Sequence, residues 1–143
     1  MSRKLRAIII EDDEALKELL SEILHLRGYD IHVFDTPEIC PLQLMPKCRC
    51  HENERCADIL LSDINMPVIT GLEFVRNQKD KGCKCPNLAL ISGDWGAERL
   101  SEAEKLGCKT FPKPYSVQEI NDWLDDVEKN IDLSIELRDW VKG

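Results

Sequence analysis

Five short apolar runs, separated by segments with helical spacing, constrain the fold of this chain more than any other feature. The runs occupy residues 5–10, 31–34, 57–62, 87–92 and 109–111. Between them, apolar residues recur three and four positions apart, at about 14–27, 37–46, 71–80, 96–106 and from residue 116 onward. Apolar strands alternating with amphipathic helices predict an α/β fold with a parallel sheet covered by helices on both faces.

The length and the charge of the chain limit its class. With 143 residues and no repeat or linker, we expect a single domain spanning 1–143, whose core is about residues 4–128. A net charge of −8 argues against nucleic-acid binding through a basic face. No apolar run reaches the roughly 20 residues of a membrane span, and no signal peptide is visible, so the expected location is cytoplasmic, with reduced thiols.

Polar residues follow several of the predicted strands where each strand ends. Glu11 and Asp12 follow the first run, Asp63 the third, Ser92 ends the fourth, and Lys113 follows the fifth. Ligands of open parallel sheets bind at the carboxyl ends of the strands. If the first and third strands are neighbours, three carboxylates converge there, and their mutual repulsion calls for a cation.

Oxygen-only ligands of this kind suit Mg²⁺, which binds a few carboxylates together with waters and phosphate. A carboxylate beside Mg²⁺ can attack phosphorus to form an aspartyl phosphate. Lys113 and the Ser92 hydroxyl would supply the cation and the hydrogen-bond donor that a phosphoryl group needs. The Asn65-Met66-Pro67 sequence after Asp63 predicts a rigid, non-helical loop beside this site.

Four segments, "IIIEDDEAL", "LLSDINMPVITGLEF", "ALISG" and "FPKPY", resemble in order and spacing the receiver domain of two-component response regulators. The resemblance, closest to chemotaxis-regulator-like receivers, covers residues 4 to about 128. It implies a flavodoxin-like, doubly wound, five-stranded parallel sheet with strand order 2-1-3-4-5.

Position by position, the resemblance implies a role for each residue of the acidic site. Asp63 would be the phosphoacceptor, and Asp12 and Asp63 would bind Mg²⁺ directly, with Glu11 acting through water. The backbone carbonyl of Asn65 would be a further ligand. Ser92 and Lys113 would contact the phosphoryl group, and the Lys113–Pro114 bond would be cis.

The resemblance further implies a stand-alone, phosphoacceptor response regulator of a two-component system or phosphorelay. Its partners would be a sensor histidine kinase or phosphotransfer protein and a downstream protein target, with no nucleic acid or membrane. It would not be an enzyme for external substrates, because a haloacid-dehalogenase-type hydrolase needs a second aspartate where Asn65 stands. No G-x-G-x-x-G follows the first strand, which disfavours a nicotinamide-binding enzyme.

Three features depart from the common receiver pattern. The aromatic residue usual three positions before the lysine is Thr110, and Trp95 is a candidate substitute in the switching mechanism. Gly93 replaces the more usual alanine after Ser92. The connection before the third strand is several residues longer than usual.

Seven cysteines leave an alternative function open, a metal- or redox-sensing module on a receiver scaffold. Six of them fall at the amino ends of the third, fourth and fifth strands, opposite the acids. Five are candidate ligands of a structural Zn²⁺ ion or, less readily, an iron–sulfur cluster: Cys48, Cys50, Cys56, Cys83 and Cys85. Reduced thiols or a labile disulfide are the other interpretations, and we expect Cys40 and Cys108 to be core residues.

The C-terminal segment is longer than the last helix of a receiver requires. We expect residues 129–143 to extend that helix beyond the domain. This extension could fold back, pair with a second copy in a homodimer, bind a partner, or fray.

Overall fold

A computed structural model describes residues 3–36, 40–65 and 69–138. Five strands form its main sheet: β1 (Arg6–Ile10), β2 (Asp30–Phe34), β4 (Ile59–Asp63), β5 (Asn87–Ser92) and β6 (Lys109–Pro112). Their order is β2-β1-β4-β5-β6, and every pairing is parallel. Counted among themselves along the chain, these strands have the order 2-1-3-4-5, which confirms the predicted doubly wound topology.

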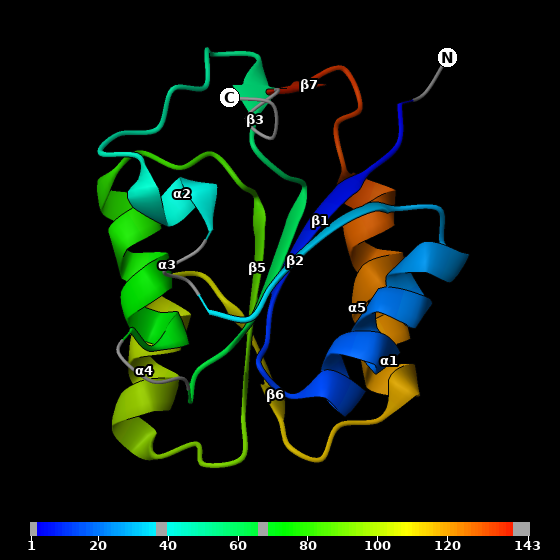
Figure 1. Ribbon diagram of the computed structural model, residues 1–143, viewed down its shortest axis with the longest axis vertical. Coiled ribbons are helices and arrows are strands. Elements are labelled where there is room, and N and C mark those ends of the chain that lie inside the picture. Colours follow the sequence, from blue (N-terminus) through cyan, green and yellow to red (C-terminus); the bar gives the residue numbers. More distant parts are fainter. Residues whose placement is uncertain (1–2, 37–39, 66–68, 139–143) are drawn as a thin grey trace.

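Helices cover both faces of this sheet, as Figure 1 shows. On one face lie α1 (Glu14–Leu26) and α5 (Val117–Asn130), and on the other α2 (Pro41–Leu44), α3 (Gly71–Asp80) and α4 (Ala97–Lys105). Because side chains alternate along a strand, each strand contributes to two cores. In β1, Ala7 and Ile9 pack in the core beneath α1 and α5, and Ile8 and Ile10 in the core beneath α3 and α4.

Short polar residues and a glycine fix the ends of the helices. Asp13, Thr70 and Ser116 each accept a hydrogen bond from the amide three residues on, at the starts of α1, α3 and α5. Gly28, predicted to end the first helix, has φ +82°, a left-handed conformation that glycine adopts without steric cost. These caps place the N-termini of the helices close to the predicted bounds.

Two helix predictions need correction. The second helix, predicted at 37–46, is the single turn α2, and residues 37–39 lie outside the described part of the chain. The extended C-terminal helical segment predicted for 129–143 is wrong over residues 131–138, because α5 ends at Asn130 and Ile131 has extended backbone, while residues 139–143 lie outside the described part of the chain. Asp132 accepts hydrogen bonds from the amide and hydroxyl of Ser134, forming a turn that competes with the helix.

A second, two-stranded sheet joins the long insert to the C-terminal segment. In it, β3 (Glu54–Arg55) pairs in parallel with β7 (Glu136–Leu137). The amide of Arg138 donates to the Arg55 carbonyl at 2.9 Å, which extends the pairing. Figure 1 places this sheet at the end of the molecule opposite the N-terminus of α1. The C-terminal segment therefore folds back on its own domain, at least to residue 138.

Candidate functional site

The order of the strands brings the predicted acids together. β1 pairs with β4 in a register that places Ile10 opposite Ser62, so the next residues of the two strands emerge side by side. Carboxylate oxygens of Glu11, Asp12 and Asp63 lie within 4.8 Å of one another. Asp63 and Glu11 are buried, whereas Asp12 is exposed. The three acids thus form one cluster at the carboxyl end of the sheet, with one side open to solvent.

A glycine allows α3 to begin directly against the end of β4. A Cβ atom placed on Gly71 would lie 2.3 Å from the Asp63 carbonyl oxygen, far inside van der Waals contact. The Gly71 amide instead donates to the Ile64 carbonyl at 3.1 Å. Residues 66–68, including Met66 and Pro67 of the predicted rigid loop, lie outside the described residues. Gly71 is a positioning residue that the sequence reasoning did not single out.

Within this cluster, the burial of Glu11 makes its negative charge unfavourable. It is 1% exposed, and its Oε1 atom has no hydrogen-bond partner among the described residues, although Oε2 accepts from the Asp13 amide at 3.2 Å. Burial, and then the negative charge of Asp63, raise the pKa of Glu11 to about 7. A buried carboxylate oxygen without a partner beside a second carboxylate is an environment that a bound cation would satisfy.

Lys113 supplies part of the missing positive charge. Its Nζ atom donates to Asp63 Oδ2 at 2.9 Å and lies 3.6 Å from Glu11 Oε1. Partial burial opposes the ammonium charge, but the hydrogen bond and charge of Asp63, with the charge of Glu11, outweigh it and raise the pKa of Lys113. The Lys113–Pro114 peptide bond is cis, as the resemblance implied.

Ser92 and Asn65 complete the surroundings of Asp63. The backbone amide of Asn65 donates to Asp63 Oδ1 at 3.1 Å, and the side-chain amide of Asn65 donates to Ser92 Oγ at 3.3 Å. Ser92 Oγ also accepts from the Asp94 amide at 3.1 Å. Arg99 donates to Asn65 Oδ1 at 3.2 Å, and nothing in its sequence context marked it for this place. The predicted site residues therefore meet at one location, with Arg99 as an addition.

The donor set fits Mg²⁺, the ion that the resemblance implies. Two buried carboxylates and one exposed carboxylate are hard oxygen ligands, few enough to leave room for waters and a phosphoryl oxygen. Glu11, Asp12 and Asp63 could hold the ion, which would supply positive charge for the entering phosphoryl group and lower the cost of burying Glu11 as an anion.

The residues that depart from the receiver pattern also have defined places. Trp95 is half-buried, packs against the core beneath α3 and α4, and donates from Nε1 to the Phe111 carbonyl at 2.9 Å. Thr110 is half-buried in the edge strand β6. A Cβ atom on Gly93 would lie 3.7 Å from the Cβ of Lys113, an ordinary contact. Trp95 thus connects the loop after Ser92 to β6, as a substitute switching residue would.

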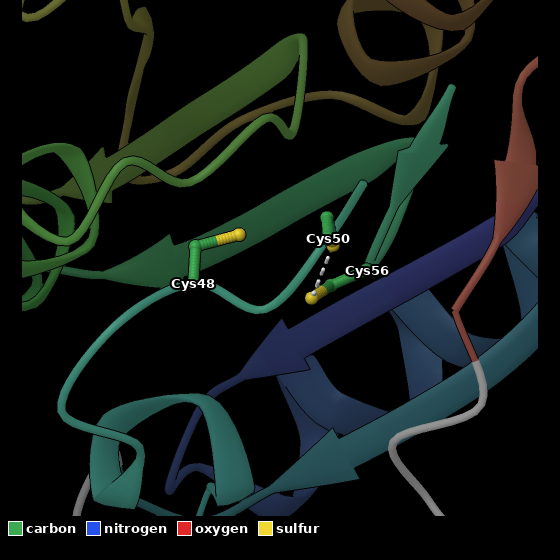
Figure 2. A group of neighbouring side chains, drawn as sticks. All are labelled: Cys48, Cys50 and Cys56. Atoms are coloured by element: carbon green, nitrogen blue, oxygen red, sulfur yellow. Dashed lines mark hydrogen bonds between the residues drawn. The ribbon is translucent and has the colours of Figure 1, made fainter. Parts of the chain in front are cut away.

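The structure brings together three of the five cysteines that were predicted as metal ligands. Cys48, Cys50 and Cys56 have sulfur atoms within 4.8 Å of one another, and the sulfurs of Cys50 and Cys56 lie 3.3 Å apart. Figure 2 shows the Cys48 side chain extending toward this pair. Cys83 lies outside this trio. Cys85 lies in the hydrophobic core, where its sulfur is 3.8 Å from the Asn87 carbonyl.

Burial governs the chemistry of these thiols. Burial raises the pKa of Cys56 to about 11. Burial, together with the neighbouring Cys56 sulfur, also raises the pKa of Cys50. The same cause raises the pKa of Cys83 and Cys85. Of the two predicted core cysteines, Cys40 is fully buried and Cys108 is half-buried against the core beneath α3 and α4.

Comparison with known proteins identifies the family of this fold and site. Residues 7–125 match the family model of the response regulator receiver domain. Curated relatives include the response regulator MprA of Mycobacterium leprae, 27% identical over 116 residues, and that of Mycobacterium avium, 28% identical over 117 residues. Both alignments cover 81% of this chain and 47% of the relative. The chain therefore spans about half the length of these curated relatives.

Solved structures share the fold. A response regulator receiver protein from Pseudomonas putida superposes with a TM-score of 0.72 at 20% identity, covering 88% of this chain and 99% of that one. The non-phosphorylated receiver domain of HemR from Leptospira biflexa gives a TM-score of 0.73 at 22% identity, and the superposition covers 90% of this chain and 98% of that one. At these identities the likeness establishes the fold, a CheY-like, flavodoxin-like α/β domain. With the match of residues 7–125, it follows that this chain belongs to the response regulator receiver domain family.

Proposed function

We propose that the chain is a phosphoacceptor receiver of a two-component system or phosphorelay, in which Asp63 is phosphorylated in a Mg²⁺-dependent reaction. The observation that carries the proposal is the meeting of Glu11, Asp12 and Asp63 at the carboxyl end of the sheet, with Lys113 2.9 Å from Asp63. Receiver domains are generally not enzymes that turn over external substrates, and their family implies interaction with a histidine kinase or phosphotransfer protein.

The proposed reaction forms one bond and breaks one. A carboxylate oxygen of Asp63 attacks the phosphorus of a phosphohistidine on the donor protein, and the bond from phosphorus to the imidazole nitrogen breaks. The imidazole retains that electron pair and is protonated. Lys113, already paired with Asp63, would move its hydrogen bond to a phosphoryl oxygen, and the hydroxyl of Ser92 would donate a second one.

The identity of Asn65 distinguishes a signalling protein from a phosphohydrolase. A phosphohydrolase that passes through an aspartyl phosphate needs a carboxylate here for acid–base catalysis. The Asn65 side chain is an amide and instead donates to Ser92 and accepts from Arg99. We therefore propose a signalling protein that does not turn over small phosphoesters.

The proposed output is a change in protein–protein contact. Phosphorylation would shift the population of conformations on the face formed by α4, β6 and α5, with Trp95 as the link from Ser92 to β6. The partner would be a downstream protein target or a second copy of the chain. None of the described helices is both long and apolar enough to cross a membrane. We propose a cytoplasmic location, where the seven cysteines of the chain stay reduced.

Phosphorylation with acetyl phosphate tests the proposal. Intact-mass spectrometry of the wild type should show one added phosphoryl group in the presence of Mg²⁺ and none with EDTA. Asp63→Asn should show none under either condition. Asp126→Asn is a matched control, since Asp126 is an exposed aspartate on α5, outside the acidic cluster, and should label normally. Undiminished labelling of Asp63→Asn would refute the assignment.

A further inference from the structure

Three thiols come together in the insert, far from the acidic cluster. The sulfurs of Cys48, Cys50 and Cys56 all lie within 4.8 Å of one another, and two of them are 3.3 Å apart. Tetrahedral zinc with Zn–S bonds of about 2.3 Å requires sulfur–sulfur separations of about 3.8 Å. The Cys50–Cys56 separation is about 0.5 Å below that value and no separation in the trio exceeds 4.8 Å, so small side-chain rotations would bring the trio onto one face of a tetrahedron.

A fourth thiol is held beside the trio by hydrogen bonds between two loops. The Cys48 amide donates to the Lys81 carbonyl at 2.9 Å, and Lys84 Nζ donates to the carbonyls of Cys50 and His51 at 3.3 and 3.0 Å. These contacts clamp the insert onto the loop that carries Cys83. Cys83 and Cys50 are both half-buried, and both pack against the core cluster that contains Cys56. Cys85, in contrast, points into the core.

The insert has little regular structure, and among its described residues 45–56 only Arg55 and Cys56 are buried. Between α2 and β4 its regular structure is the two-residue strand β3, which pairs with the equally short β7. A segment that buries few side chains needs a cross-link to remain ordered, and a metal can supply one. Cys56 is 2% exposed, whereas Cys48 and Cys50 are half-buried, so one side of the thiol group is open for entry of an ion.

We propose that Cys48, Cys50, Cys56 and Cys83 bind one Zn²⁺ ion as four thiolates, at the end of the sheet opposite Asp63. Binding releases the thiol protons and joins the insert to the loop between α3 and β5. The site is structural, because four protein ligands leave no open position for substrate. It is independent of the proposed phosphorylation.

Metal uptake by the full chain, purified under reducing conditions and stripped with a chelator, tests the site. The wild type should bind one zinc ion per chain by elemental analysis. Cobalt(II) in its place should give the intense visible bands of a tetrahedral thiolate site. Cys48→Ser, a half-buried position that tolerates change, should weaken zinc binding by more than the roughly 10–100-fold typical of losing an outer-shell partner. Cys83→Ser should alter the cobalt spectrum and weaken zinc binding.

Cys108→Ser is the matched control, since Cys108 is half-buried against the core and lies outside the trio; it should bind zinc as the wild type does. Acetyl phosphate labelling of each variant verifies that the domain is folded. The proposal would be overturned if wild type that accepts the phosphoryl group took up no zinc, or if Cys48→Ser or Cys83→Ser took up zinc as the wild type does. A Cys50–Cys56 disulfide in natively purified, zinc-free protein would also overturn it.

Discussion

Replacing Glu11 with glutamine should make the metal-free protein more stable above neutral pH. Glu11 is buried with one oxygen unpartnered, and burial and the charge of Asp63 raise its pKa from 4.5 to about 7. The folded state therefore holds this proton more tightly than the unfolded state does. The resulting stabilisation is complete below pH 4.5 and is lost as the pH rises through 7. Glutamine does not titrate, so Glu11→Gln lacks this loss.

The magnitude follows from the size of the shift. At about 1.4 kcal/mol for each pKa unit, a rise from 4.5 to about 7 corresponds to about 3 kcal/mol of unfolding free energy. Glu11 is 1% exposed, so solvent screening removes little of this value. The advantage of Glu11→Gln over the wild type should grow by about 2.5 kcal/mol between about pH 5 and about pH 8, because a small part of the loss already occurs below pH 5.

Urea denaturation in EDTA at these two pH values measures the difference. Glu18→Gln is the control, because Glu18 is an exposed glutamate on α1 and should leave the pH dependence of the wild type unchanged. Millimolar Mg²⁺ at the higher pH should stabilise the wild type more than Glu11→Gln, because the ion binds the ionised cluster. Parallel pH dependences of the wild type and Glu11→Gln would contradict the reasoning.

Four further substitutions test the acidic site and its surroundings. Lys113→Met removes the cation paired with buried carboxylates and should cost about 2–4 kcal/mol of unfolding free energy at neutral pH, measured by urea denaturation. Gly71→Ala should cost about 2 kcal/mol or more and slow acetyl phosphate labelling, since its Cβ would collide with the Asp63 carbonyl. Gly93→Ala, which makes only an ordinary contact, should change stability by no more than about 0.5 kcal/mol. Beryllofluoride with Mg²⁺ should change tryptophan fluorescence in the wild type and leave that of Trp95→Phe unchanged; a response retained in Trp95→Phe would exclude Trp95 as the switching residue.

The sheet and the acidic site were predictable from the sequence because both depend on strands. The three central strands, β1, β4 and β5, each contain an apolar run that ends at a polar residue. The doubly wound order then places Glu11 and Asp63 at the ends of adjacent strands. Gly71 and Arg99 were not found, since their roles come from one backbone approach and one long side chain that no local pattern encodes.

The C-terminal segment shows where periodicity misled the prediction. Leu133, Ile135 and Leu137 alternate with polar residues, which is the spacing of a strand, and β7 is a strand at residues 136 and 137. The helical interpretation followed from the apolar stripe of the preceding helix. The strand that pairs with β7 is β3, which is only two residues long and lies in the cysteine-containing insert. Neither strand could therefore be recognised from its own sequence.

Reductive trapping of the phosphorylated protein tests the central claim most directly. Borohydride reduces an aspartyl phosphate to homoserine, and peptide mass spectrometry then identifies the converted residue. After treatment with acetyl phosphate and Mg²⁺, conversion should occur at Asp63, should disappear when EDTA replaces Mg²⁺, and should be absent at Asp12 and Asp94. Conversion at a different carboxylate, or none at any, would contradict the account.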